Sequence, residues 1–442
     1  MRKIGLIGVG CHAKRIYVPW LMSNHQHKWT VAVDLSCQET KVREAVAVSP
    51  PEHLIFSNTP SSEDIDPKVF AQLEKLQATG DLDTLIICTD PLNRRQWLLW
   101  GIQRGLDLII DKPLTAPYNP DNLGTLATEI KSDFEEILHC AQSSSSKIWI
   151  QAQRRAHCGY KLVKDVLRQS IEETSTPITH LDVYHADGMW VLPNEWNRDH
   201  HPYRHKWGKI LHSGYHFIDL ASFLLELSDP QDTSWLHFNA YATRGEAQVQ
   251  QLQHQNLLST ANSIVNTSHG ELDLSVLGQI QHQHHPRTTI ALNLLQNSFS
   301  RRSSNSPPKD PYKGAGRVRH ERINVQIGPF INVQVHSYQA HEISDPNPIE
   351  VYGPGHIDHF DVHIYRNPLL KGKRYEQHQI GSTLSHPHNE SARIELLNQF
   401  LNDDSHLSSI QQHKRSIEWI CSIYSALHEK TCGGAGVLKW TE

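Results

Sequence analysis

The first residues that could do chemistry form a glycine-rich turn near the start of the chain. A short apolar run leads into Gly8-Val9-Gly10-Cys11-His12-Ala13, which has the pattern G-x-G-x-x-A. The first glycine of this pattern permits a tight turn, the second lets a pyrophosphate approach the backbone, and a small third residue allows close helix–strand packing. Free N–H groups at the start of the following helix attract phosphate. The turn therefore predicts a dinucleotide-binding site.

A carboxylate at the end of the next apolar run bears on which dinucleotide would bind. Asp34 lies 21 residues after Ala13. A carboxylate at this place accepts hydrogen bonds from the ribose hydroxyls of adenosine. It also repels a 2′-phosphate, so the sequence favours NAD, with NADP as the alternative cofactor.

A second group of reactive residues lies in the middle of the chain. His212 and His216 are four residues apart, so on a helix they share one face, with Tyr215 close to it. Histidine titrates near neutral pH, and His216 is therefore a candidate acid or base for the hydroxyl proton of an alcohol. His212 either contacts the substrate or packs. The same spacing suits metal ligands, but no Cys or carboxylate partner stands at a ligand spacing, so no metal is predicted.

The elements that would position the glycine turn lie in residues 1–150. Short apolar runs alternate there with helical stretches, as in a parallel sheet covered by helices. The expected strands are Lys3–Gly8, Trp29–Asp34, His53–Ser57, Thr84–Cys88, Leu106–Ile110 and Lys147–Gln151, and the expected helices are Pro67–Thr79, Leu92–Arg104 and Asn122–Cys140. We therefore expect an α/β dinucleotide-binding domain at residues 1–150.

From residue 151 onward the hydrophobic pattern changes. Polar and apolar residues alternate, as in antiparallel strands with one solvated face. The expected strands are His180–His185, Trp235–Thr243, Glu271–Gln279, Thr288–Leu295 and Ile323–His341, and the expected helices are Tyr160–Gln169, His212–Leu227, Ser391–Asn402 and Gln411–Glu429. We assign residues 151–442 to an α+β substrate-binding domain with C-terminal helices.

Three motifs together resemble one family of oxidoreductases. Asp111-Lys112-Pro113 ends the fifth expected strand, and Thr89-Asp90-Pro91 follows the fourth. With the glycine turn, they resemble the Gfo/Idh/MocA family, the relatives of glucose–fructose oxidoreductase and inositol dehydrogenase, in which an E-K-P motif closes the fifth strand. The segment Gly208–Asp219 looks like that family's helix in which an Asp and a final His face the substrate. The resemblance implies an N-terminal Rossmann domain and a C-terminal α+β domain with an open, mostly antiparallel sheet.

The resemblance also implies roles for single residues. Lys112 would lie near the nicotinamide and the substrate hydroxyl, and Pro113 would set the chain direction there. The chain departs from the family in three places, with Asp111 for the usual Glu, Arg94 for a frequent His, and His212 for the catalytic Asp. The expected site residues are: catalytic, Lys112, His212, Tyr215 and His216; cofactor-binding, Gly8, Gly10, Cys11, His12, Ala13, Asp34, Thr89, Pro91, Asn93, Asp111, Lys112 and Pro113; substrate-binding, Arg155, Trp190, Trp207, His212 and His216.

Two further segments carry unusual side chains. Trp190, Trp196 and Trp207 form either a stacking wall for a ring-shaped substrate or the buried anchors of a folded loop. The stretch Arg301–Arg319 is rich in Ser, Pro, Gly and basic residues and is interpreted mainly as solvated loop charge. A site for an anionic group such as phosphate is its alternative interpretation.

Composition limits the classes of function. The chain has 442 residues and a net charge of −5, which argues against a nucleic-acid binder. No apolar run approaches the roughly 20 residues of a membrane span. The 7 cysteines are scattered without a C-x-x-C pair, as expected for the reducing cytoplasm and not for a disulfide framework.

These observations predict an NAD(P)-dependent oxidoreductase. It would move a hydride between nicotinamide and a secondary alcohol or ketone of a sugar, sugar derivative or cyclitol, with an imine as a further substrate class. Two alternatives stay open: an NAD-retaining enzyme that cleaves glycosidic bonds, and a dinucleotide-binding sensor or scaffold without chemistry. The predicted partner is a small molecule, and a family-like open sheet is compatible with a dimer or tetramer.

Overall fold

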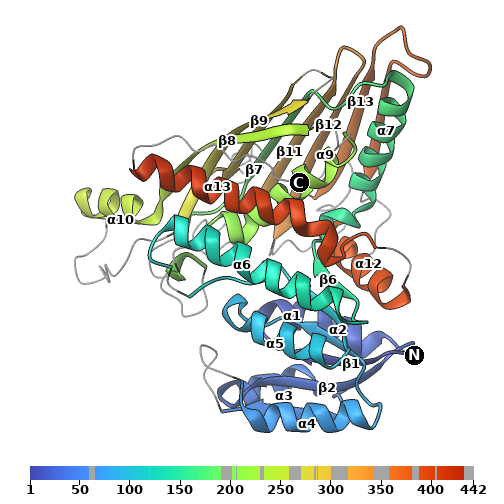
Figure 1. Cartoon of the computed structure of the whole chain (residues 1–442), viewed down its shortest axis with the longest axis vertical. Coiled ribbons are helices and arrows are strands. Elements are labelled where there is room, and N and C mark those ends of the chain that lie inside the picture. The colour runs from blue at the N-terminus through green and yellow to red at the C-terminus, as the bar shows by residue number, and fades with distance from the viewer. Residues whose placement is uncertain are drawn as a thin grey trace, which may run out of the picture. The chain divides into compact units, whose positions relative to one another are not determined.

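The structure is a computed structural model of the whole chain (Figure 1). It describes residues 1–58, 65–118, 120–190, 202–205, 207–228, 233–257, 270–282, 285, 287–299, 317–341, 358–380, 388–403 and 406–432. The chain divides into two compact units, which are described separately. The first consists of Met1–Tyr118, Thr128–Gln153 and Ala392–Ile417, and the second of Asn119–Ala127, Arg154–Ser391 and Glu418–Glu442. The division at residues 150 and 151 stays a prediction.

The first unit contains a six-stranded parallel sheet with the order β3-β2-β1-β4-β5-β6. Its strands are β1 (Lys3–Ile7), β2 (Lys28–Leu35), β3 (His53–Ser57), β4 (Thr84–Ile87), β5 (Asp107–Asp111) and β6 (Ile148–Gln151). The helices here are α1 (Cys11–Arg15), α2 (Tyr17–Ser23), α3 (Glu39–Ala45), α4 (Pro67–Ala78), α5 (Pro91–Gln103) and α6 (Leu123–Gln142), the last of which begins in residues of the second unit. Every residue of β4 and β6 is buried, which explains their continuous apolar runs.

The second unit contains an eight-stranded sheet with the order β14-β13-β12-β11-β7-β10-β9-β8. Its strands are β7 (His180–Ala186), β8 (Thr233–Arg244), β9 (Glu271–His282), β10 (Thr288–Leu295), β11 (Arg317–Ile327), β12 (Ile331–His341), β13 (His359–Arg366) and β14 (Tyr375–Ile380). Only β7 and β10 pair in parallel among these strands. The predicted fold class is thus confirmed.

Helices α7 (Cys158–Thr174) and α9 (Tyr215–Leu225) pack against this sheet (Figure 1). The remaining α-helices among the described residues are α10 (Gly245–His254), α12 (His388–Asn402) and α13 (Lys414–Cys432). No helix in the described part of the chain is long and apolar enough to cross a membrane.

The structure corrects three expectations about the second unit. The segment Ile323–His341 is not one strand but the hairpin of β11 and β12, because Pro329 in the turn lacks the N–H that a continued ladder needs. The sequence interpretation also missed β13, β14 and α10. The expected helix His212–Leu227 starts instead with a π-helical turn at Ile210–Gly214, followed by α9.

Candidate active site

The glycine turn has the geometry that a dinucleotide pyrophosphate requires. Gly8 has φ +88°, and a Cβ there would lie 2.9 Å from the carbonyl oxygen of Cys88, so only glycine fits. A Cβ at Gly10 would meet no atom within 4 Å, so its backbone borders open space. The side chain of Ala13 is fully buried, as expected for close packing of the helix on the strand. These residues fit NAD.

The helix after the turn is shorter than the sequence suggests. It ends as α1 at Arg15, and α2 begins at Tyr17. Pro19 accounts for the break, because its ring clashes with the carbonyl of the residue four positions earlier, Arg15. Cys11 is exposed in the first turn of α1, where phosphate would bind.

Asp34 is fixed beside the turn by two hydrogen bonds. Its Oδ2 accepts from the backbone N–H of Val9 at 2.8 Å, and its Oδ1 accepts from that of Leu35 at 2.7 Å. The side chain is half-buried at the end of β2. The carboxylate thus stands next to the turn with part of its surface accessible.

Replacing Gly10 with alanine is expected to weaken NADH binding at least about tenfold. The backbone of Gly10 has φ −72°, which alanine adopts, and the new methyl group meets no protein atom. Stability should therefore stay unchanged while the methyl group occupies the space for the pyrophosphate. Fluorescence titration measures the affinity, and thermal unfolding checks the fold. Unaltered NADH affinity would contradict this placement.

The carboxylate of Asp111 is the centre of a buried polar cluster at the end of β5. Tyr17 Oη donates to its Oδ1 at 2.7 Å, and Cys88 Sγ donates to its Oδ2 at 2.8 Å. His12 Nε2 lies 3.6 Å from the same Oδ2. One carboxylate therefore connects the glycine turn with α2, β4 and β5, and it is the residue directly before Lys112.

The cluster has a defined charge state at neutral pH. Burial lowers the pKa of His12 to about 4, although Asp111 acts in the opposite direction, so His12 is neutral. Burial alone would raise the pKa of Asp111, but His12, Arg94 and the hydrogen bonds from Cys88 and Tyr17 lower it. Burial and the Asp111 charge raise the pKa of both Tyr17 and Cys88. Asp111 is thus the only anion of this group.

Arg94 clamps the backbone on both sides of Lys112. Its Nη1 donates to the carbonyl oxygens of Asp111 and Pro113, and its Nε donates to that of Thr89 at 2.9 Å. The Lys112–Pro113 peptide bond is cis, and the Lys112 side chain is half-buried. Pro91 and Asn93, the other predicted cofactor contacts, lie half-buried in the first turn of α5, next to its N-cap, Asp90.

A π-helical turn and the first turn of α9 carry the two candidate histidines of the second unit, His212 and His216. The N–H of Gly214 bonds to the carbonyl of Lys209, five residues earlier, at 2.7 Å. A Cβ at position 214 would lie 2.6 Å from that carbonyl oxygen, so glycine is needed. His212 in the turn is half-buried, and His216 is buried in the first turn of α9. A π-helical turn inserted in a helix frequently marks a functional site.

Three predicted site residues have interior positions instead. Tyr215 is fully buried, and burial raises its pKa well above the usual value, while its catalytic role stays a prediction. Arg155 is fully buried and donates from Nε and Nη2 to Asp219, at 3.0 Å and 2.7 Å, so it holds α9. Its contact with substrate stays a prediction. Trp207 is also buried and stacks on His205, which makes it a loop anchor.

Trp190 differs from Trp207. Its side chain is 41% exposed and makes an edge contact with Phe299. It remains a candidate for stacking on a sugar ring. Trp196 lies outside the described residues.

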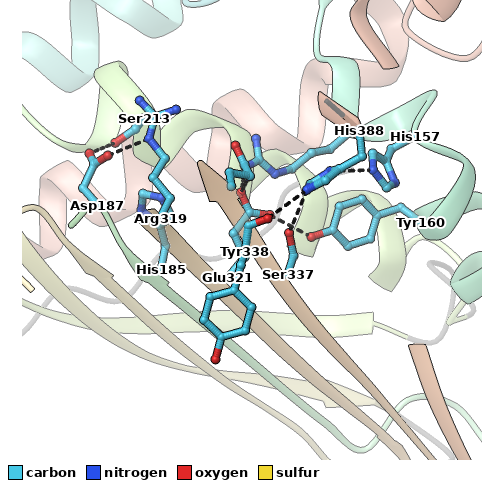
Figure 2. Close-up of polar contacts among 12 residues, drawn as sticks. His157, Tyr160, His185, Asp187, Ser213, Arg319, Glu321, Ser337, Tyr338 and His388 are labelled. Carbon is cyan, nitrogen blue, oxygen red and sulfur yellow. Dashed lines mark hydrogen bonds and ion pairs between the residues drawn. The ribbon is translucent and has the colours of Figure 1, made fainter. Parts of the chain in front are cut away.

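A cationic cluster that sequence reasoning missed lies beside the π-helical turn (Figure 2). Lys209 is completely buried and donates to Asp187 Oδ2 at 3.2 Å and to His185 Nδ1 at 3.3 Å. Arg319 Nε donates to Asp187 Oδ1 at 2.9 Å, and Ser213 Oγ donates to Oδ2 at 3.4 Å. Arg319 belongs to β11, so its interpretation as solvated loop charge is wrong. The one feature of the sequence that could have indicated this cluster is Lys209, a lysine at the start of an apolar helix.

Glu271 anchors the start of the same turn. Its carboxylate accepts from the backbone N–H groups of Ile210 at 2.8 Å and Gly208 at 3.3 Å, and from Tyr424 Oη at 3.3 Å. Burial raises its pKa from 4.5 to about 7, although these hydrogen bonds lower it. A buried acid therefore fixes the element that carries His212.

Folding stability should reflect this acid. The pKa of Glu271 is higher in the folded protein than in the unfolded chain. Its contribution to the free energy of unfolding is therefore lost as pH rises from about 4.5 to 7. Glu271→Gln stays neutral, so its free energy of unfolding should rise relative to that of wild type by up to about 3 kcal/mol across that interval. The variant also loses an acceptor for the backbone N–H of Gly208. This loss changes the free energy of unfolding by the same amount at every pH. Urea unfolding across pH measures the slope, and Glu173→Gln, an exposed control, should follow wild type. If the free energies of unfolding of Glu271→Gln and wild type changed in parallel with pH, the prediction would be contradicted.

The described residues divide between the two units. Lys112 and the predicted cofactor contacts belong to the first unit, and His212 and His216 belong to the second. In the described part of the chain, no group of three or more His, Cys, Asp or Glu side chains is arranged to hold a metal ion.

Comparisons with known proteins agree with this picture. Residues 2–133 match the Gfo/Idh/MocA family model, described as an oxidoreductase family with an NAD-binding Rossmann fold. None of the curated proteins matches the chain. An oxidoreductase from Agrobacterium radiobacter, solved with NAD+, L-tartaric acid and magnesium, has a TM-score of 0.60 and 14% identity, covering 99% of this chain and 98% of its own.

Two further solved structures have the same fold. The aldose–aldose oxidoreductase from Caulobacter crescentus, complexed with glycerol, has a TM-score of 0.58 and 12% identity, with 100% of both chains covered. The WlbA dehydrogenase from Bordetella pertussis, complexed with NADH and UDP-GlcNAcA, has a TM-score of 0.56 and 13% identity, covering 100% of this chain and 99% of its own.

The fold and the glycine turn thus define the class of a protein with a dinucleotide-binding Rossmann domain. The family match confirms the resemblance to the Gfo/Idh/MocA oxidoreductases over residues 2–133. It supports the predicted cofactor, NAD, and the predicted enzyme class, an NAD(P)-dependent oxidoreductase.

Proposed function

We propose that the protein moves a hydride between NAD and a secondary alcohol or ketone of a sugar, sugar derivative or cyclitol. The observation that carries this proposal is the glycine turn, in which Gly10 borders open space and Asp34 is fixed alongside. When bound, NAD supplies the hydride acceptor or donor at C4 of its nicotinamide. The glycerol and UDP-sugar ligands of two similar structures support the substrate class.

The protein's own residues would handle the oxygen and the proton. Lys112 binds the alcohol oxygen and stabilises the developing alkoxide, and Arg94 holds the backbone on both sides of it. His216 takes the hydroxyl proton during oxidation and returns it during reduction. His212, half-buried in the π-helical turn, contacts the substrate.

Asp34 would select NAD over NADP. Fluorescence titrations with NADH and NADPH in parallel should show tighter binding of NADH. Asp34→Asn keeps an acceptor for the Val9 N–H but removes the charge that repels the 2′-phosphate. We expect the ratio of the NADPH to the NADH dissociation constant to fall at least about tenfold. An unchanged ratio would remove Asp34 as the selecting group.

Isotope transfer tests the reaction itself. The protein is incubated with NADH deuterated at C4 and a panel of ketoses, inososes and cyclic imines. Deuterium in the product, detected by mass spectrometry, supports hydride transfer. Exchange of label with an intact glycoside, without net oxidation of NADH, would indicate the NAD-retaining alternative. NADH binding without label in any ligand would count against the proposed function.

A further inference from the structure

Two cations share one carboxylate at the end of β7. Asp187 is buried, and one of its oxygens takes a hydrogen bond from Lys209. The other oxygen takes a hydrogen bond from Arg319 (Figure 2). The Lys209 ammonium also donates to Nδ1 of His185, so this imidazole is neutral and carries its proton on Nε2. Among these described groups, the two cations exceed the single carboxylate by one positive charge.

In the part of the chain that the structure describes, two neighbouring charged groups are already engaged elsewhere. Arg154 is already paired with Glu321, which lies on the same face of β11 as Arg319. The carboxylate of Asp273 also raises the pKa of Lys209, and it accepts from the backbone N–H groups of Gln296 and Asn297. A buried positive charge is costly without an anion, so the cluster is suited to an anionic ligand.

Arg319 offers the donors for such a ligand. Only its Nε is used, and its two terminal nitrogens contact no partner in the part of the chain that the structure describes. The side chain is 30% exposed, whereas Asp187 and Lys209 are buried. A guanidinium held at Nε keeps the Nη1–Nη2 edge, which matches the two oxygens of a carboxylate or phosphate.

The cluster adjoins the candidate acid–base residues. Ser213 Oγ lies 3.4 Å from Asp187 Oδ2, and Ser213 directly follows His212. Lys209 lies three residues before His212, at the start of the same turn. A ligand bound by Arg319 would thus lie close to the element that carries His212 and His216.

We propose that Arg319 binds an oxyanion, a carboxylate or a phosphate, that the substrate carries. Asp187 orients the guanidinium, and Lys209 is a positioning residue that fixes Asp187. The inference rests on the proposed function, because it takes the ligand to be the substrate. It narrows the substrate class to acidic or phosphorylated sugars and cyclitols.

A binding experiment tests the proposal without turnover. Calorimetry measures the affinity of the NADH-loaded protein for D-gluconate, D-glucose 6-phosphate and D-glucose. We expect at least one of the two anions to bind about tenfold or more tightly than D-glucose. Arg319→Gln should weaken that anion about 10- to 100-fold, as expected for lost charge-assisted hydrogen bonds. Arg319→Lys keeps the charge but lacks the planar edge, so its anion affinity should lie between those of wild type and Arg319→Gln. It replaces Arg319→Gln in the test if that variant does not fold.

Arg322→Gln is the matched control. Arg322 lies three residues further along β11 and pairs with Asp182 at 3.2 Å, on the opposite face of the strand. Its replacement should leave the affinity for both anions unchanged.

The outcomes separate the ligand sources and the two proposals. Preference for gluconate identifies a carboxylate, and preference for the 6-phosphate identifies a phosphate. Binding of an anion that depends on Arg319, with no label transfer from NADH, supports the oxyanion site and counts against the proposed reaction. Equal affinity for glucose and both anions, no anion binding, or wild-type anion affinity in Arg319→Gln would overturn the inference.

Discussion

Lys112→Ala is expected to lower the turnover number at saturating NAD and substrate by at least about 100-fold, the scale of a lost acid–base or alkoxide contact. The physical reason is the rigidity of its surroundings. Arg94 binds the carbonyl oxygens on both sides of Lys112, and the preceding carboxylate is held by Tyr17 and Cys88. A lysine on so fixed a backbone can place its ammonium with the accuracy that catalysis needs.

The experiment separates catalysis from binding. Steady-state kinetics gives kcat and KM, and NADH titration shows that the cofactor still binds. Lys41→Ala, an exposed lysine of α3 in the same unit, should leave kcat unchanged. A higher KM with unchanged kcat would mean that Lys112 only helps to bind substrate. Unchanged kcat and KM would exclude Lys112 from the reaction.

The sequence predicted the first unit well because its signals are local. Strands buried on both faces appear as short continuous apolar runs, and all six were found to within about two residues. The glycine turn and Asp34 are likewise fixed by their place in the chain. By contrast, the partners of Asp111 come from α2 and β4, and no local pattern links Tyr17 or Cys88 to it.

The second unit was predicted less completely because several of its elements lack an apolar pattern. The strand β14 is polar from Tyr375 through Gln379, and alternation shows only in its burial. The helix α10 buries little beyond Val249, so no apolar stripe identifies it. The strand β13 does alternate, with Phe360, Val362 and Ile364 on its buried face, and this signal could have been used.

The candidate site shows where residue type and spacing stop being informative. The His-x-x-x-His spacing was interpreted on an α-helix, but a π-helical turn depends on how Gly214 packs and has no clear sequence pattern. Arg155, Trp207 and Tyr215 look like contact residues by type, yet all three are buried. Burial depends on tertiary packing, which a single sequence does not reveal.

Asp219→Asn is expected to lower the free energy of unfolding by about 3–5 kcal/mol, the cost of leaving a buried charge without its partner. Asp219 and Arg155 are both fully buried and joined by a bidentate contact, with Nη2 to Oδ1 at 2.7 Å and Nε to Oδ2 at 3.0 Å. The asparagine variant keeps the shape of the side chain but removes the negative charge that Asp219 places against the guanidinium. Urea denaturation measures the loss.

Two further variants show whether the pair or only its charge balance matters. Asp165→Asn removes one partner of the exposed pair with Arg168 in α7 and should give no measurable change. The double variant Arg155→Met/Asp219→Leu removes both buried charges and should be more stable than Asp219→Asn. Additive losses in the double variant would contradict a coupled pair. Because Asp219 lies three residues after His216 on α9, the single variant should also lower kcat beyond what its unfolded fraction explains.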